Sequence, residues 1–210
     1  GSGLLLLSRL PLRDPVFERY RLAGLPQRIH HGDYWGGKGF VMARIGTDAG
    51  FVTVLDTHLH AQYTDDPVDE YRAMRAAQVI QLAAAVSARR EPVVALGDFN
   101  LRSGNPDHAV LIGLTGFRHA ALALDHPQDT VLEPSPYRGQ GHAGGERIDD
   151  AFTRTGERAD AEPRQLERVF DETFAIAGET GTYSDHAGLR LVAEVVPQAP
   201  RTLPTVTPET

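Results

Sequence analysis

The sequence has 210 residues, of which 41% are hydrophobic and 23% are charged. This length is enough to bury a sizeable core in one or two domains, and the composition is ordinary for a globular protein. The formal net charge of −7 argues against a general nucleic-acid binder, which needs a basic surface for phosphates. The absence of cysteine excludes disulfides and thiolate metal sites.

The longest apolar runs, such as residues 4–7, are far shorter than the roughly 20 residues that a membrane-spanning helix needs, and no signal peptide is visible. We therefore expect a soluble protein, and its location stays open between the cytoplasm and secretion. Frequent Ala, Arg and Gly residues are typical of a high-GC genome and indicate a bacterial source. Residues 197–210 are rich in Pro and Thr and predict a disordered tail after the folded part, residues 1–196.

The predicted elements alternate between strands and helices. Apolar or β-branched runs predict strands at residues 4–9, 39–46, 51–59, 92–98, 147–154 and 188–196. The turn signal at residues 47–50 joins the second and third runs into a hairpin. Because a hairpin and a helix-covered strand occur together, we expect a mixed α/β sandwich rather than a purely parallel sheet.

Two helices are predicted between these strands. Asp66 followed by Pro67 is a typical helix start, and the apolar spacing after it predicts a long helix to about Arg90. A weaker helix covers residues 106–114. Arginines of the long helix are expected to face solvent; they are Arg72, Arg75, Arg89 and Arg90.

Polar side chains follow or interrupt several of the predicted strands: His58, His60, Asp98, Asn100, Asp149, Asp185 and His186. On a strand, the two-residue spacing of Asp98 and Asn100 would point both side chains to one face. Acids, an amide and histidines at several strand ends can converge over one edge of a sheet. Such a group suits phosphate ester hydrolysis, which needs oxygen ligands for a hard cation, a base near neutral pKa and a donor to the phosphate oxygens.

Each of these positions also has a purely structural interpretation. Residues 98–100 can form a turn after a strand, and residues 185–186 can cap an element. His60 is interpreted mainly as a packing residue, and Asp150 as structural or solvent-facing. Trp35 either anchors its loop in the core or contacts lipid, and the sequence leaves this open.

Four motifs along the chain, THLHA, GDFN, RIDDAF and SDH, resemble those of the endonuclease/exonuclease/phosphatase superfamily of magnesium-dependent phosphodiesterases. Within it, the segments GSGLLLLSRLPL, IHHGDYWGGKGFVMARI and THLHAQY are similar to those of neutral sphingomyelinases. The resemblance runs from residue 1 to about residue 195. It implies a DNase I-like four-layer α/β sandwich, with residues 1–196 as the catalytic domain.

The resemblance implies roles for the residues of these motifs. His186 would be the general base, with Asp185 beside it near the metal. Asp149 would hold the other ring nitrogen of His186. Asp98 and Asn100 would orient the water and a phosphate oxygen close to the metal.

The same resemblance implies a substrate side and a metal. His58 would stabilise the transition state, and Asp33 and Lys38 would belong to the substrate-binding segment, with Lys38 and Asn100 close to the phosphate. The cation would be Mg²⁺, with Mn²⁺ as the alternative, held by Asp98 and Asp185. The main glutamate ligand of the superfamily lies upstream of the matched stretch. We therefore expect a chain that lacks its N-terminal strands, a fragment or a subunit completed by another polypeptide, with weak metal binding and little activity.

Two positions depart from the family pattern. His119 stands where an acid is common, and Asp150 stands where an aromatic residue is usual. We expect these departures to affect fine substrate contacts and not the chemistry.

The implied reaction is hydrolysis of sphingomyelin, at a membrane surface, to ceramide and phosphocholine. The alternatives are a DNA or abasic-site endonuclease, an inositol-phosphate phosphatase of the same superfamily, and an inactive fragment or interaction module. A metallo-β-lactamase site is excluded because Gln62 and Tyr63 replace its required Asp and His ligands.

Overall fold

The structure is a computed structural model and describes residues 2–63, 69–102, 104–132, 145–176 and 178–204. Its main sheet has the strand order β1-β2-β3-β4-β6-β5. These strands are β1 (Arg13–Arg19), β2 (Gly39–Thr47), β3 (Gly50–His58), β4 (Val93–Asp98), β5 (Arg118–His119) and β6 (Asp149–Arg154). Only β3 and β4 pair in parallel; the other neighbours in this sheet are antiparallel.

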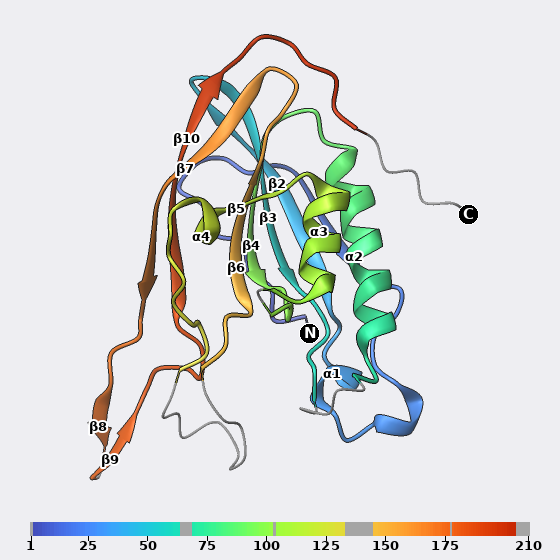
Figure 1. Ribbon diagram of the computed structural model, residues 1–210, viewed down its shortest axis with the longest axis vertical. Coiled ribbons are helices and arrows are strands. Elements are labelled where there is room, and N and C mark those ends of the chain that lie inside the picture. Colours follow the sequence, from blue (N-terminus) through green and yellow to red (C-terminus); the bar gives the residue numbers. More distant parts are fainter. Residues whose placement is uncertain (1, 64–68, 103, 133–144, 177, 205–210) are drawn as a thin grey trace.

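Two hairpins complete the strands. A long one pairs β7 (Ala159–Val169) with β10 (Gly188–Pro197), and a short one pairs β8 (Phe174–Ile176) with β9 (Glu179–Gly181). The short hairpin and α1 (Gly32–Trp35) lie at the same end of the molecule, at the bottom of Figure 1.

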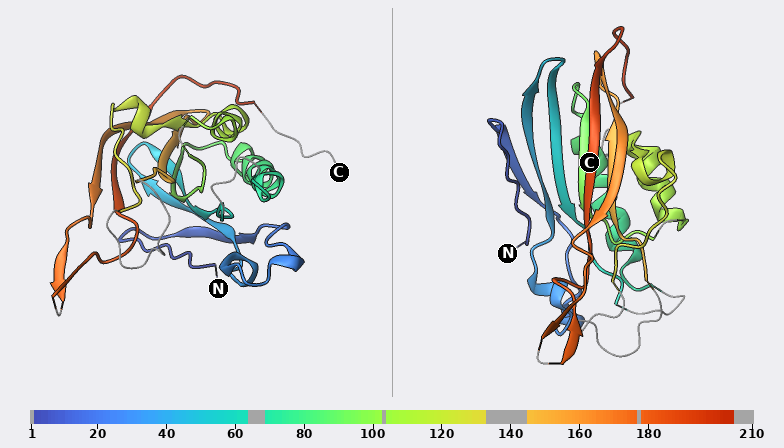
Figure 2. Two further views of the ribbon diagram at one scale, coloured as in Figure 1. Left: turned by 60° about the horizontal axis from the view of Figure 1, so that its bottom comes forward. Right: turned by 90° about the vertical axis from the view of Figure 1, so that its left-hand side faces the viewer.

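Two helices, α2 (Arg72–Ser87) and α3 (Pro106–Thr115), lie side by side over one face of the main sheet (Figures 1 and 2). The start of α3 follows from its sequence: the Asn105 side chain accepts a hydrogen bond from the Asp107 N–H at 3.0 Å, and Pro106 is the first helical residue. The remaining helical turns are η1 (Pro26–Arg28) and α4 (Ala120–Ala123).

The central strands β4 and β6 are covered on both faces, and the alternation of side chains along each strand decides which core each residue joins. Ala95 and Phe152, which face each other across β4 and β6, pack with α2 and α3. Leu96 and Ala151, the next pair, pack with Leu166 of the β7–β10 hairpin. The central strands therefore lie between a helix layer and a hairpin layer.

Most of the predicted elements are present, but the strand expected at residues 4–9 is wrong. Among the described residues no ladder forms there, and the first strand begins at Arg13. Leu5 and Leu7 are 72% and 80% exposed. The apolar run thus has the composition of a strand without a neighbouring strand to pair with.

The long helix differs from its prediction in two respects. The expected start at Asp66 and Pro67 falls outside the described residues, and the described helix begins at Arg72. Arg75 is 1% exposed and not solvent-facing, because its guanidinium forms an ion pair with Asp69 and donates to the His60 carbonyl at 3.4 Å.

Beyond β10 the chain returns to the β6–β7 turn. The Gln198 N–H donates to the Arg158 carbonyl, and the Arg201 N–H donates to the Glu157 carbonyl, both at 2.9 Å. Residues 205–210 of the predicted disordered tail lie outside the described residues. None of the helices in the described part of the chain is long and apolar enough to cross a membrane.

Leu82 is fully buried between α2 and the sheet, whereas Ile80 of the same helix is 46% exposed. We expect Leu82→Ala to lower the free energy of unfolding by about 2–5 kcal/mol, because it removes apolar contacts and leaves a cavity. Chemical denaturation measures this change. Ile80→Ala is the matched control and should cost much less; equal losses for the two variants would contradict the packing described here.

Candidate active site

Three polar side chains lie in one row across the main sheet. His58 is the last residue of β3, Asp98 the last of β4 and Asp149 the first of β6, and the strand register places them directly opposite one another. Residues opposite each other in a sheet point to the same face. Pairing of the three strands therefore brings together motifs that are distant in the sequence.

The close approach of β3 and β4 depends on Gly97, the residue before Asp98. Its φ is +144°, and a Cβ at this position would lie 2.1 Å from the Thr57 carbonyl oxygen. Glycine is therefore required there, and it allows Asp98 to lie beside His58. His58 Nε2 lies 3.2 Å from Asp98 Oδ2.

Asn100 joins the row from a turn and not from the strand, so the strand-spacing argument for it was wrong. β4 ends at Asp98, and Asn100 has a left-handed φ of +48°. Its N–H donates to Asp98 Oδ1, and its side-chain amide donates to the Leu59 carbonyl, both at 2.9 Å. The turn thus fixes the Asp98 carboxylate.

His186 reaches the row from the segment that leads into β10. Its Nδ1 lies 2.7 Å from Asp149 Oδ2. The hydrogen bond to Asp149 is the largest influence on His186 and raises its pKa to about 9, against the opposing effect of burial. Ligand atoms of Asp98, Asp149 and His186 all lie within 4.8 Å of one another. The structure therefore brings His186 to the Asp98–Asn100 turn.

Lys38, the only lysine in the sequence, lies on the other side of His58. Its Nζ forms a hydrogen bond with His58 Nε2 and an ion pair with Asp33 Oδ1 at 3.0 Å. Lys38 is only 3% exposed, and burial lowers the pKa of its ammonium although Asp33 and Asp98 act to raise it. A buried amine therefore faces the row.

The helical turn α1, which carries Asp33, is attached to the segment after β3. Asp33 Oδ2 accepts the Ala61 N–H at 2.7 Å, and the Asp33 N–H donates to the Tyr63 hydroxyl at 2.9 Å. Burial acts to raise the pKa of Asp33, but Lys38 and the Ala61 N–H together lower it. Asp33 is therefore held as the ionised partner of the lysine.

The neighbouring aromatic residues pack rather than face the row. His60 is fully buried and stacks on Tyr71 with ring centroids 4.0 Å apart, in agreement with its packing interpretation. His31 stacks on Tyr63 at 4.1 Å. Trp35 is 71% exposed, which excludes the core-anchor interpretation, and its indole N–H donates to the Ile29 carbonyl at 2.7 Å.

Asp185, one of the two expected metal ligands, does not join the compact group of ligand atoms. It is half-buried, and the Ser184 hydroxyl lies 3.3 Å from one of its oxygens. Asp150, adjacent to Asp149, points away from the row: it is fully buried and lies 2.7 Å from His119. The two departures from the family pattern therefore contact each other inside the protein.

Thr130 belongs to none of the sequence motifs, yet it supports the site. This residue is fully buried, and its hydroxyl oxygen accepts the N–H groups of Ile148 and Asp149 at 3.2 and 3.1 Å. Its carbonyl accepts the Ala187 N–H at 2.7 Å. Thr130 therefore connects the two segments that carry Asp149 and His186. A single threonine outside any motif gives no sequence signal for such a role.

The group is chemically suited to a hard divalent cation and to hydrolysis. Asp98 and Asp149 offer carboxylate oxygens, which such a cation prefers. The four side chains of the row and of His186 are between 18% and 32% exposed, so water and a substrate can reach them. The His186 imidazole, the carboxylates of Asp98 and Asp149 and the buried ammonium of Lys38 therefore lie around one accessible place.

The comparisons with known proteins agree on one family. The model of the Endonuclease/Exonuclease/phosphatase family matches residues 1–186. A putative neutral sphingomyelinase of Drosophila melanogaster is 29% identical over 208 residues, covering 96% of this chain and 46% of that protein. The corresponding protein of Caenorhabditis elegans is 31% identical, covering 90% and 48%. The chain thus spans about half the length of these two relatives.

Solved structures show the same fold at lower sequence identity. D. rerio TDP2, complexed with a single-strand DNA product, superposes with a TM-score of 0.63 at 16% identity, covering 87% of this chain and 68% of that chain. Sphingomyelinase C from Streptomyces griseocarneus superposes with a TM-score of 0.59 at 21% identity, covering 91% and 66%. The family match over most of the sequence, together with these likenesses, shows that the chain belongs to the endonuclease/exonuclease/phosphatase family and has a partial DNase I-like α/β sandwich.

Proposed function

We propose that this chain carries the catalytic site of a sphingomyelin phosphodiesterase, which hydrolyses sphingomyelin to ceramide and phosphocholine with Mg²⁺, or Mn²⁺ in its place. Two relatives, each described as a putative neutral sphingomyelinase, match nearly the whole chain and support this substrate class. The observation that carries the proposal is the contact of His186 with Asp149 next to Asp98, because it supplies a base beside carboxylates.

His186 is proposed as the general base. Its Nδ1 is bound to Asp149, which leaves Nε2 to take a proton from the attacking water. The water oxygen then bonds to phosphorus, and the bond from phosphorus to the ceramide oxygen breaks. The ceramide oxygen takes up a proton from solvent, and His186 returns to solvent the proton that it accepted. Because a raised pKa makes the imidazole a stronger base but leaves less of it neutral at pH 7, turnover should rise with pH toward about 9.

His58 and Lys38 are proposed to stabilise the charge that develops on the phosphate oxygens. Both are held in place before substrate binds, His58 by the end of β3 and Lys38 by its ion pair with Asp33. Donors that are already oriented and partly desolvated stabilise developing charge without reorganising. Asn100, whose N–H and amide fix the Asp98 turn, is proposed to orient, together with Asp98, the water and a phosphate oxygen close to the metal.

The cation is proposed to bind Asp98 next to Asp149, with Asp185, which lies outside this group of ligand atoms, as the second proposed ligand. Its chemistry is to neutralise phosphate oxygens as a Lewis acid. The carboxylates present fit a hard cation, and a neighbour of the same fold, the beta toxin of Staphylococcus aureus, has been solved with bound magnesium ions. Trp35 is exposed at the end of α1, the helical turn that also carries Asp33, and we expect it to contact the lipid surface.

The function is tested by phosphocholine release from sphingomyelin vesicles with Mg²⁺. His186→Asn should lower turnover on the order of 100- to 10,000-fold, because it removes the base. The exposed His30→Asn is the matched control and should keep wild-type turnover. No release with either Mg²⁺ or Mn²⁺ would contradict the proposal and favour an interaction module; preferential cleavage of duplex DNA with an abasic site would favour a nuclease.

The role of Asp149 is tested by the titration of His186. Asp149→Asn should lower the His186 pKa from about 9 toward its ordinary value of 6.5, because the carboxylate that favours the imidazolium is lost. Imidazole NMR signals of the metal-free protein measure it. The same contact stabilises the fold below pH 6.5, and this stabilisation is lost as pH rises through about 9. An unchanged pKa in the variant would contradict the contact.

The role of Lys38 is tested by Lys38→Met. Turnover should fall by about a hundredfold, as when a preorganised donor to a developing oxyanion is removed. Because Lys38 is the only lysine, reductive methylation with ¹³C labels its side chain and the N-terminus alone, so NMR can follow its lowered pKa directly. Full turnover in the variant would remove Lys38 from the proposed mechanism.

A further inference from the structure

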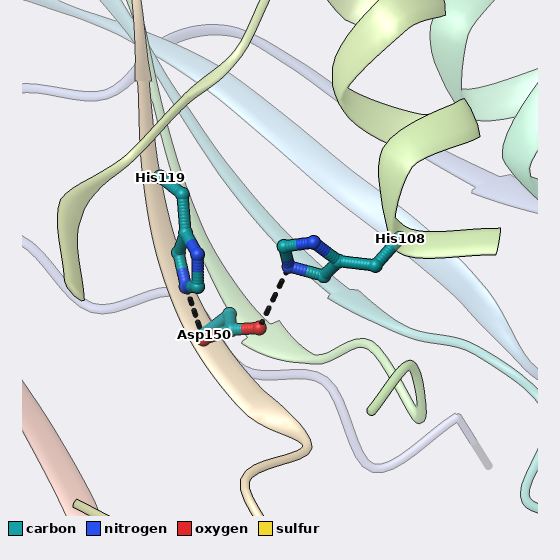
Figure 3. A group of neighbouring side chains, drawn as sticks. All are labelled: His108, His119 and Asp150. Atoms are coloured by element: carbon teal, nitrogen blue, oxygen red, sulfur yellow. Dashed lines mark hydrogen bonds and ion pairs between the residues drawn. The ribbon is translucent and has the colours of Figure 1, made fainter. Parts of the chain in front are cut away.

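A second group of titratable side chains lies on the helix side of the main sheet (Figure 3). It consists of His108 from α3, His119 from β5 and Asp150 from β6, which are 4%, 4% and 0% exposed. Asp149 and Asp150 are consecutive on β6 and so point to opposite faces of the sheet. The buried group and the candidate active site therefore share one strand.

Arg147 balances the charge of this group. Asp150 Oδ1 accepts hydrogen bonds from His119 Nε2 and Arg147 Nε, both at 2.7 Å. His108 Nε2 lies 3.5 Å from the other carboxylate oxygen. Burial acts to raise the pKa of Asp150, but its contacts with His108, His119 and Arg147 lower it to about 2. Asp150 is thus an ionised carboxylate paired with a guanidinium.

The spacing of His108, His119 and Asp150 would also permit a metal ion. The position of Arg147 argues against this, because its guanidinium already lies on the carboxylate. A divalent cation added beside this guanidinium would leave a net positive charge in a buried place, which is costly. The group is therefore better explained as a charge-balanced polar network.

The network is connected to the segment that precedes the active site. Arg147 Nη1 donates to the carbonyls of His126 and Gln128 at 2.9 and 3.0 Å. A few residues later, Val131 pairs with His186 as an isolated antiparallel bridge. Arg147 thus links Asp150 to the chain on which the backbone of His186 rests.

Three further hydrogen bonds close this connection. The Leu132 N–H donates to the Asp185 carbonyl at 2.8 Å, and the Ala187 N–H donates to the Thr130 carbonyl at 2.7 Å. The Thr130 hydroxyl accepts the Asp149 N–H at 3.1 Å. Both partners of the His186–Asp149 contact are therefore held by residues 130–132.

We propose that Arg147, Asp150 and His119, which we name the buried brace, are positioning residues for His186: they fix residues 126–132, which in turn hold the backbone of His186 and Asp149. The brace touches no substrate. Its effect on catalysis rests on the function proposed above, whereas its effect on the backbone does not.

The experiment is amide hydrogen exchange followed by NMR on the whole chain. Arg147→Lys keeps the charge but loses the contacts to the two carbonyls, and should speed exchange at Leu132 and Ala187 on the order of tenfold or more. Arg154→Lys is the matched control. Arg154 is also buried on β6 and donates to two carbonyls, those of Val86 and Arg89, far from the site. Arg154→Lys should leave the amide exchange rates of Leu132 and Ala187 unchanged relative to that of Val79 in α2.

Equal effects of the two variants at Leu132 and Ala187 would overturn the proposal. If Arg147→Lys does not fold, His119 supplies a second test. His119→Gln keeps a donor close to the position of Nε2 and should restore the slow exchange that His119→Phe loses. Failure of His119→Gln to restore it would overturn the role of the His119 hydrogen bond.

Two further measurements separate the possible causes. One equivalent of a transition metal in the purified protein, released by EDTA with faster exchange at Leu132, would overturn the charge-balanced interpretation. If Arg147→Lys alters exchange but the wild-type chain releases no phosphocholine, the buried brace is retained and the proposed function is rejected. Altered exchange with reduced turnover and unchanged KM supports both.

Discussion

The register of three strands is the constraint on which the candidate active site depends. His58, Asp98 and Asp149 face each other because the register of β3, β4 and β6 sets His58 opposite Asp98 and Asp98 opposite Asp149. A shift of one residue in any of these pairings would turn that side chain to the opposite face. The burial of Ala95 and Phe152 on one face and of Leu96 and Ala151 on the other resists such a shift. Packing on both faces of the sheet thus fixes the strand register, and the register places the side chains of the candidate active site.

The two faces of β6 illustrate how the sheet separates charges. Asp149 and Asp150 are adjacent carboxylates, yet each has its own partners and the sheet lies between them. The pKa of Asp150 is lowered by donors on the helix side, whereas Asp149 raises the pKa of His186 on the open side. Strand β6 therefore carries a structural carboxylate, Asp150, next to a carboxylate of the candidate active site, Asp149.

The sequence predicts the elements whose signals are local. The hairpin of β2 and β3, the strand β4 and the helix α3 all have apolar patterns with clear turn or cap residues, and all are present. The strand at residues 4–9 fails because a strand needs a partner, which an apolar pattern does not supply. β7 was missed because it is rich in charged residues and pairs with β10, about twenty residues further on. Arg75 was misplaced because its buried ion pair with Asp69 has no local signal.

Gly97 is required in the GDFN motif for a steric reason and not for a chemical one. Any side chain at this position would meet the backbone of Thr57, so even alanine would push β3 and β4 apart. An inactive variant at position 97 would then reflect a widened gap between two strands, with every reacting group still present. Gly97 is therefore needed so that the backbones of β3 and β4 can lie close together. Loss of activity on its substitution carries no information about proton transfer or phosphate binding.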